Sequence, residues 1–427
     1  MDIFRIQGGR PISGTVRVSG AKNAALPLMA ATLLSEEPIR FAGAPTRLVD
    51  VQTMGRLLVS LGTEFTERRG GELVLTTPTI EDTTAAYDLV RTMRASVLVL
   101  GPLLARCGQA RVSMPGGCAI GSRPVDLHLK AMESLGARIE VESGYVVART
   151  PPGGLVGGRV VFEKITVGGT ENALMAAVLA RGESVIENAA REPEIVALVE
   201  LLRAMGAEIE GEGTHRLVIQ GQDRLSGCRF EVPPDRIEAG TLLCAGAIGQ
   251  GSLTLSNCPV SHVEALVEKL READCRLKIG EVNGAGIGEV TIDAPFRPRA
   301  VDVTTGEYPG FPTDMQAQLM AVMAVAQGRS MFTEKIFENR YLHASELVRM
   351  GGDIHVEGRT ATIRGVKRLS GAPVTASDLR ASASLVLAGL VAHGETIVRR
   401  IYHLDRGYEN LEIKLSKLGA SVTREAE

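Results

Sequence analysis

The sequence contains no tryptophan, and aromatic residues make up only 4% of its 427 residues. Proteins that bind nucleic acid or carbohydrate by stacking need exposed aromatic rings, so this composition argues against such surfaces. The formal net charge is −3, which gives no basic field for nucleic acid, and no run of Lys and Arg suggests a membrane surface. We therefore expect neither nucleic acid nor membrane among the partners.

Patterns that bind metals and nucleotides are missing as well. The six cysteines form no Cys-x-x-Cys pair, and the seven histidines show no metal-ligand spacing, so no metal and no cofactor is expected. No Walker loop occurs, which argues against direct ATP hydrolysis. The glycine-rich run 284–288 leads into a strand-like stretch. A dinucleotide site needs a helix at that point, so we predict a hairpin.

Long apolar segments are also lacking. Residues 1–5 begin no apolar signal core, and runs such as 95–107 are too short and too interrupted to cross a bilayer. We expect a cytoplasmic protein with free thiols and no membrane insertion.

What the chain does contain is one repeated unit. An amphipathic helix ends in Leu/Met-Gly-Ala or a close variant, and a short alternating strand follows, with a period of about 70 residues. These phrases occupy residues 61–65, 135–139, 205–209, 350–354 and 418–422. The glycine fits the left-handed position after a helix. A sixth copy, 273–277, has Asp274 at that position, which should cost about 1 kcal/mol relative to glycine.

Each unit reads as strand, helix, strand, helix, strand, strand, which indicates an α/β protein. The first helix is rich in alanine and apolar nearly all round, so we expect it to lie inside. The strand at 4–7 has no unit before it, and the sixth unit has no final strand after it. We infer that this strand completes unit six, which gives three units in each of two domains. Domain A is predicted to comprise residues 22–232, and domain B residues 1–21 plus 233–427, with a crossing at Pro233-Pro234.

One loop, residues 114–126, combines glycines and prolines with Cys118 and Arg123. A cysteine in such a loop is accessible and close to positive charge, which favours a reactive thiolate. The alternative is a small apolar residue that happens to lie in a turn.

Positive side chains recur at the start of the first helix of the unit or in loops near it. They are Lys22, Arg94, Arg236 and Arg380 at the helix starts, and Arg123, Lys164, Arg340 and Arg406 in the loops. Each alone could be a solvated surface charge. Together with free N–H groups at helix N-termini, they favour a cleft for a polyanionic ligand. Asp235, Asp314 and Asp378 have the sequence context of helix N-caps.

Several long motifs resemble the UDP-N-acetylglucosamine enolpyruvyl transferases, over essentially the whole chain. These motifs are residues 19–24, 115–121, 123–128, 188–194, 311–316 and 405–409. The resemblance implies two inside-out α/β barrels, each of three βαβαββ repeats. It also implies transfer of the enolpyruvyl group of phosphoenolpyruvate to the 3-hydroxyl of UDP-N-acetylglucosamine, without a cofactor. In that family the reaction is the first committed step of peptidoglycan synthesis.

The resemblance also implies roles for individual residues. Cys118 would be the general acid toward C3 of phosphoenolpyruvate and the target of fosfomycin-type epoxides. Lys22, Arg123 and Arg406 would hold phosphoenolpyruvate, while Asn23 and Asp314 would position the sugar, with Asp314 as base. The sugar-nucleotide residues would be Arg94, Arg123, Pro124, Val125, Asp126, Leu127, Lys164, Ile165, Thr166, Val167 and Ile336. To the substrate-binding residues we add Arg340 and Arg380 from the recurring cations.

Two alternatives stay open at this stage. An enolpyruvylshikimate phosphate synthase would share the fold and the reaction class but use another acceptor alcohol. A silent paralogue would bind the UDP-sugar without turnover. The presence of the catalytic groups weighs against this alternative, because a protein without turnover does not need them. The departures from the family pattern, Asp274 and Glu307, lie outside the matched catalytic positions.

Overall fold

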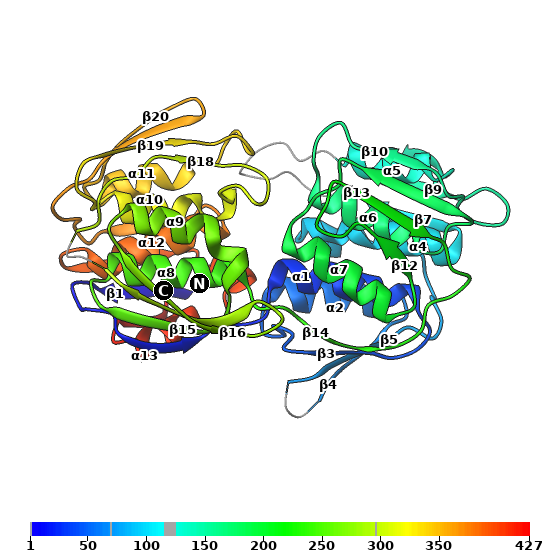
Figure 1. Cartoon of the computed structure of the whole chain (residues 1–427), viewed down its shortest axis with the longest axis horizontal. Coiled ribbons are helices and arrows are strands. Elements are labelled where there is room, and N and C mark those ends of the chain that lie inside the picture. The colour runs from blue at the N-terminus through cyan, green and yellow to red at the C-terminus, as the bar shows by residue number, and fades with distance from the viewer. Residues whose placement is uncertain (1, 69–70, 115–124, 295–296) are drawn as a thin grey trace. The chain divides into compact units, whose positions relative to one another are not determined.

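The computed structural model describes residues 2–68, 71–114, 125–294 and 297–427, which form two compact units (Figure 1). Of the described residues, unit 1 contains 2–19 and 234–427, and unit 2 contains 20–114 and 125–233. The boundaries thus fall after residues 19 and 233, whereas the boundaries predicted from the sequence fall after residues 21 and 232.

The described strands form six four-stranded sheets that share one topology. In unit 2 the strand orders are β14 (Arg229–Glu231), β3 (Ile39–Ala42), β5 (Leu73–Thr76), β4 (Glu64–Glu67); β6 (Thr84–Ala85), β7 (Gln109–Ser113), β9 (Tyr145–Arg149), β8 (Arg138–Glu142); and β10 (Arg159–Val161), β11 (Glu183–Glu187), β13 (Arg216–Gln220), β12 (Glu208–Glu210). In each of these sheets the first two strands are parallel and the other neighbours are antiparallel.

The sheets of unit 1 repeat this pattern. Their orders are β2 (Gly14–Arg17), β15 (Ser252–Pro259), β17 (Ile287–Asp293), β16 (Arg276–Val282); β18 (Val303–Thr304), β19 (Arg329–Thr333), β21 (Thr360–Arg364), β20 (Asp353–Glu357); and β22 (Pro373–Thr375), β23 (Glu395–Arg399), β1 (Asp2–Gln7), β24 (Ser421–Ala426). Strands β16 and β17 form the hairpin predicted around residues 284–288.

The N-terminal strand β1 lies between β23 and β24 and is antiparallel to both. Phe4 is opposite Val398 on one side and Arg424 on the other. Strand β1 therefore occupies the final-strand position of the sixth repeat, as the sequence predicted.

Two sheets take their opening strand from a distant part of the chain. Strand β2 precedes the first helix of unit 2 in the chain, but it pairs in parallel with β15 of unit 1. Strand β14 precedes residues 234–427 of unit 1 in the chain, but it pairs in parallel with β3 of unit 2. The sheet to which each of these two strands belongs was not predicted from the sequence.

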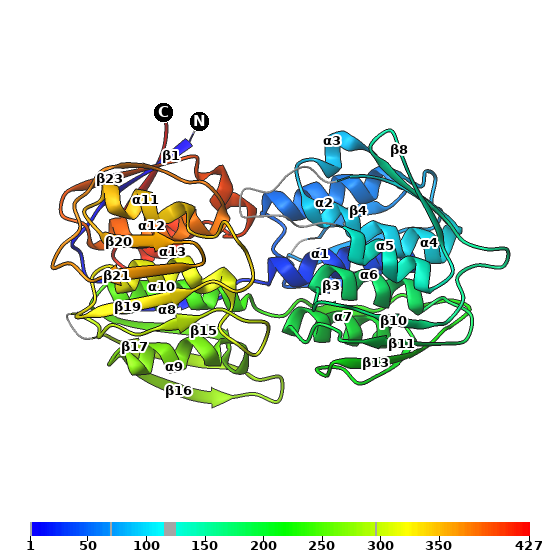
Figure 2. The same cartoon turned by 90° about the horizontal axis from the view of Figure 1, so that it is seen from above.

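The first helices of the repeats form the interior of each unit. They are α1 (Lys22–Ala31), α4 (Leu100–Cys107) and α6 (Val167–Ala177) in unit 2, and α8 (Arg236–Ile248), α10 (Gln316–Met323) and α12 (Leu379–Val391) in unit 1. Every residue of α10 is buried, and α8, α10 and α12 contact one another (Figure 2). In strands such as β13 every second residue is buried, and the residues between are half-buried or exposed. The predicted internal position of these helices is therefore confirmed.

The second helices each have one buried face. They are α2 (Val49–Ser60), α5 (Asp126–Ser134), α7 (Pro193–Ala204), α9 (Glu264–Glu272), α11 (Leu342–Arg349) and α13 (Leu411–Lys417), and a short helix α3 spans Tyr87–Val90. After these six helices the predicted glycines have positive φ, for example 108° at Gly62 and 96° at Gly419, and Asp274 has φ of 65°. Within the described ranges, no helix combines the length and apolarity needed to span a bilayer.

Candidate functional site

The predicted cations lie where inner helices begin. Lys22 is the first residue of α1, and Arg236 is the first residue of α8. Arg94 begins the 3₁₀ helix η2 (Arg94–Val99), which runs into α4, and Arg380 is the second residue of α12. Free backbone N–H groups at such ends add to the attraction for anions.

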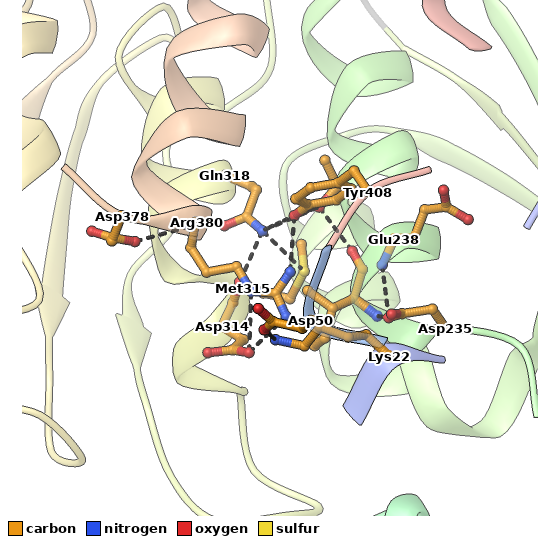
Figure 3. A network of polar contacts seen from close by, with 12 residues as sticks. Lys22, Asp50, Asp235, Glu238, Asp314, Met315, Gln318, Asp378, Arg380 and Tyr408 are labelled. Carbon is orange, nitrogen blue, oxygen red and sulfur yellow. Dashed lines mark hydrogen bonds and ion pairs between the residues drawn. The ribbon is translucent and has the colours of Figure 1, made fainter. Parts of the chain in front are cut away.

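Asp314 forms an ion-pair cluster in unit 1 (Figure 3). Its Oδ1 accepts a hydrogen bond from Arg340 Nη2 at 2.8 Å, and its Oδ2 accepts from Arg380 Nε at 3.1 Å and Nη2 at 2.8 Å. Both arginine side chains are 4% exposed, whereas the Asp314 side chain is 26% exposed. The carboxylate therefore sits at the outer end of two buried guanidinium groups.

Asp314 is not a helix N-cap, so that expectation is wrong. It lies inside the 3₁₀ helix η4 (Thr313–Met315), and its carboxylate bonds to arginines distant in sequence. Asp235 and Asp378 do cap α8 and α12, each by accepting two backbone N–H bonds. The N-cap predictions for these two residues are confirmed.

A buried hydrogen-bond network holds Arg380 (Figure 3). Arg380 Nη1 donates to the Tyr408 hydroxyl at 3.3 Å, and that hydroxyl lies 2.9 Å from Thr241 Oγ1. Gln318 Nε2 is 2.8 Å from the backbone oxygen of Asp314 and 3.1 Å from Thr241 Oγ1. Burial, the largest single influence, lowers the pKa of Arg380, but the charges of Asp314, Tyr408 and Asp235 and the hydrogen bond to Asp314 together outweigh it, so the pKa is raised. Arg380 is therefore a fixed cation.

In unit 2, Lys22 lies close to a buried carboxylate. Its Nζ is 3.5 Å from Asp50 Oδ2, and Asp50, in the first turn of α2, is 3% exposed. This contact fixes the ammonium group at the N-terminus of α1, beside the predicted sugar residue Asn23.

His128 is a buried neutral histidine in unit 2. Asn172 Oδ1 accepts from Gly101 N–H at 2.9 Å, so its Nδ2 is the donor group. That Nδ2 donates to the Val97 carbonyl at 3.0 Å and lies 2.8 Å from His128 Nδ1. Nδ1 must then accept, which places the ring proton on Nε2. Burial, followed by the charge of Arg94, lowers the His128 pKa to about 4.

The described residues of the two predicted sugar-nucleotide runs of unit 2 lie at or just before neighbouring helix N-termini. Val125 is the N-cap of α5, which Asp126 and Leu127 begin. Thr166 caps α6 by accepting from Gly169 N–H at 3.2 Å. Helices α5 and α6 pack together. A Cβ on Gly168 would lie 2.9 Å from His128 Cε1, so only glycine lets the start of α6 approach this ring.

The remaining predicted residues are dispersed. Ile336 follows β19, Lys164 is exposed before α6 near Ile165 and Val167, and Arg406 ends the 3₁₀ helix η5 (Ile401–Arg406) two residues before Tyr408. Cys118, Arg123 and Pro124 lie outside the described residues. The structure thus joins Asp314 directly to Arg340 and Arg380, within unit 1.

Comparison with known proteins gives full-length matches. The family described as EPSP synthase (3-phosphoshikimate 1-carboxyvinyltransferase) matches residues 6–415. A protein of Nitratidesulfovibrio vulgaris named UDP-N-acetylglucosamine 1-carboxyvinyltransferase is 54% identical over 100% of both chains. One of the same name from Rhodospirillum centenum is 53% identical over 99% of both. The chain belongs to the enolpyruvyl transferase family.

Solved structures agree with this membership. The enolpyruvyl transferase NikO from Streptomyces tendae is 25% identical, with a TM-score of 0.86 over 99% of both chains. EPSP synthase from Acinetobacter baumannii is 18% identical, with a TM-score of 0.77 over 100% of both chains. At that identity the second likeness concerns the fold alone. The predicted fold class, the two-domain enolpyruvyl transferase fold, is confirmed.

Some residues of this family member were missed by sequence reasoning. Tyr408 and His128 lie within the motifs that carry the family resemblance, so their position in those motifs was the available signal. Gln318, Thr241 and Glu334 carry no local signal, because polar residues in apolar helices or after strands are common in any fold. Among the described residues, no cluster of three or more His, Cys, Asp or Glu could hold a metal ion.

Glu171, the fifth residue of α6, should make the free energy of unfolding depend on pH. Burial, then Glu194 and Glu192, raise its pKa from 4.5 to about 8, so the folded chain keeps a proton that the unfolded chain loses above pH 4.5. Between pH 5 and 8 the unfolding free energy of the parent should therefore fall with rising pH, relative to Glu171→Gln. The slope should approach about 1.4 kcal/mol per pH unit. Urea unfolding of both proteins across this range measures it, and parallel curves would contradict the assignment.

Proposed function

We propose that this chain transfers the enolpyruvyl group of phosphoenolpyruvate to the 3-hydroxyl of UDP-N-acetylglucosamine and releases phosphate. The observation that carries the proposal is the 54% identity, over the full length of both chains, to relatives named for this reaction. The likeness to EPSP synthase structures is at 18% identity and supports no choice of acceptor alcohol.

The reaction is an addition followed by an elimination. The 3-hydroxyl oxygen bonds to C2 of phosphoenolpyruvate while C3 takes a proton, which gives a tetrahedral phospho-ketal. The C2–O bond to phosphate then breaks and C3 loses a proton, so the enol ether is regenerated on the sugar. Each step needs an acid and a base at the reacting atoms. We assign Asp314 as the base for the 3-hydroxyl proton and Cys118 as the acid toward C3.

The binding roles follow from charge and position. Phosphoenolpyruvate is assigned to Lys22, Arg123 and Arg406, because its phosphate and carboxylate need fixed cations. The sugar nucleotide is assigned to Asn23, Arg94, Ile336 and the runs 123–127 and 164–167. Residues 125–127 and 166–167 lie at the starts of α5 and α6, where N–H groups favour a diphosphate. Arg340 and Arg380 contribute by holding Asp314.

The assigned chemistry needs no cofactor. The product would serve peptidoglycan synthesis, and a cytoplasmic location stays a prediction.

Phosphate release from phosphoenolpyruvate tests the proposal. It should require UDP-N-acetylglucosamine and should not occur with shikimate 3-phosphate. A fosfomycin-type epoxide should abolish it by alkylating Cys118, seen as one added mass that Cys118→Ser does not acquire. Release with shikimate 3-phosphate alone would contradict the acceptor assignment. Binding of the UDP-sugar without any phosphate release would indicate the silent paralogue.

A further inference from the structure

Glu334 is a fully buried carboxylate at the end of a strand in unit 1. It directly follows β19, is 0% exposed, and lies beside Thr305, which directly follows the parallel strand β18. Because carboxyl ends of neighbouring parallel strands meet at one edge of a sheet, the two side chains face each other. Thr305 Oγ1 donates to Glu334 Oε1 at 2.8 Å.

The same carboxylate accepts three further hydrogen bonds. Oε1 accepts from the backbone N–H of Ile336 at 2.8 Å and of Phe337 at 3.2 Å, and Oε2 accepts from Thr313 Oγ1 at 2.9 Å. Buried carboxylates are stable only when such donors satisfy them. Glu334 therefore ties three separate segments to one point: the end of β18, the start of η4, and the turn after β19.

Two of these segments carry residues assigned to the reaction. Thr313 directly precedes Asp314, and Ile336 lies in the turn that leads to Arg340. The ion pair between Arg340 and Asp314, at 2.8 Å, joins the same two segments a second time. The Asp314 side chain is 26% exposed, so the fully buried Glu334 is the more rigid of the two ties.

We propose that Glu334 is a positioning residue for enolpyruvyl transfer: its carboxylate sets the spacing between the segment of Asp314 and the segment of Ile336 and Arg340. The expected effects on kcat and KM rest on the proposed function. Glu334 is assigned no contact with either substrate. It acts by holding the Asp314 backbone and the Ile336 amide in place, and misplacement of such groups by about 1 Å costs on the order of 100-fold in rate.

Steady-state kinetics of Glu334→Ala and Glu334→Gln test this. The alanine variant removes all four acceptor contacts, and kcat/KM for UDP-N-acetylglucosamine should fall on the order of 100-fold. In Glu334→Gln the amide oxygen can still accept from Ile336 and Phe337 while the amide nitrogen donates to the Thr313 hydroxyl. This variant should therefore lose less than about tenfold. Such a rescue by shape and hydrogen bonding is the expected sign of positioning.

A second variant separates the two segments. Thr313→Val cuts only the tie to the Asp314 segment, so it should lower kcat with little change in KM for the sugar nucleotide, whereas Glu334→Ala should change both. Asp302→Ala is the matched control. Its exposed carboxylate accepts the Met331 N–H at 2.7 Å next to the same pair of parallel strands, and its loss should leave both constants unchanged.

Hydrogen exchange in the substrate-free protein tests the hydrogen bonds of Glu334 independently of the proposed function. The amides of Ile336 and Phe337 should exchange faster in Glu334→Ala than in the parent, and not in the Asp302→Ala control. If the parent protein releases no phosphate, the proposed function is refuted, but the result of the exchange experiment still holds. A folded Glu334→Ala with unchanged kcat and KM would overturn the positioning role, as would unchanged exchange of the two amides. Should the alanine variant not fold, equal kinetics of Glu334→Gln, Thr313→Val and parent would overturn it.

Discussion

Asp314→Asn is expected to reduce turnover by about 10²–10⁴-fold, because a general base of this kind contributes about that much. Asparagine keeps the size and shape of the side chain, but it cannot take the proton of the 3-hydroxyl. The measurement is phosphate release at saturating phosphoenolpyruvate and UDP-N-acetylglucosamine. A variant that retains more than a tenth of the parent rate would refute the assignment of Asp314 as base.

The same substitution also lowers stability, and the assay must separate the two effects. Without the carboxylate, Arg340 and Arg380, each 4% exposed, face a neutral amide. Loss of one partner of a buried ion pair costs about 3–5 kcal/mol. Circular dichroism at the assay temperature therefore serves as the control, with turnover compared only where the variant is folded.

Arg380→Met is expected to lower the unfolding free energy by about 3 kcal/mol, the low end for breaking a buried pair. Methionine fills part of the volume, but the hydrogen bonds to Asp314 and the Tyr408 hydroxyl are lost. The low end applies because Arg340 still pairs with Asp314. Urea denaturation followed by circular dichroism measures the change.

Arg424→Met provides the matched comparison within unit 1. Arg424 forms ion pairs with Asp2, Asp405 and Glu412, so it has more carboxylate partners than Arg380. Its side chain, however, is 29% exposed. Pairs that remain in contact with solvent are worth about 1 kcal/mol or less. Equal losses for the two variants would show that burial is not what makes Arg380 important.

The repeat architecture could be predicted because each repeat has the same local sequence patterns. Glycine after five of the six second helices, with Asp274 after the sixth, and the alanine-rich first helices recur at fixed places. Strand β1 was recognised because the sequence before it contains no repeat to which it could belong. The pairing of β2 and β14 could not be predicted, because strands of four and three residues carry no pattern that identifies a partner. Their partners depend on how the whole chain folds.

The candidate site was also predictable only in part. Cations at helix starts follow from the repeat, so Lys22 and Arg380 were found from the sequence. The surroundings of Asp314 were not, because an aspartate before an apolar helix fits an N-cap equally well. Its partners Arg340 and Arg380 are 26 and 66 residues away. Glu334 shows the same limit, since its role depends on the distant Thr305 and Thr313.

The central place of β1 between β23 and β24 has a consequence for synthesis on the ribosome. Residues 2–7 are translated hundreds of residues before their neighbours, residues 395–399 and 421–426. The strand must stay unpaired while the residues of unit 2, 20–114 and 125–233 among those described, are made. Since domains fold as units during synthesis, unit 2 is completed before unit 1, and strand β1 leaves the exit tunnel long before it can join its sheet.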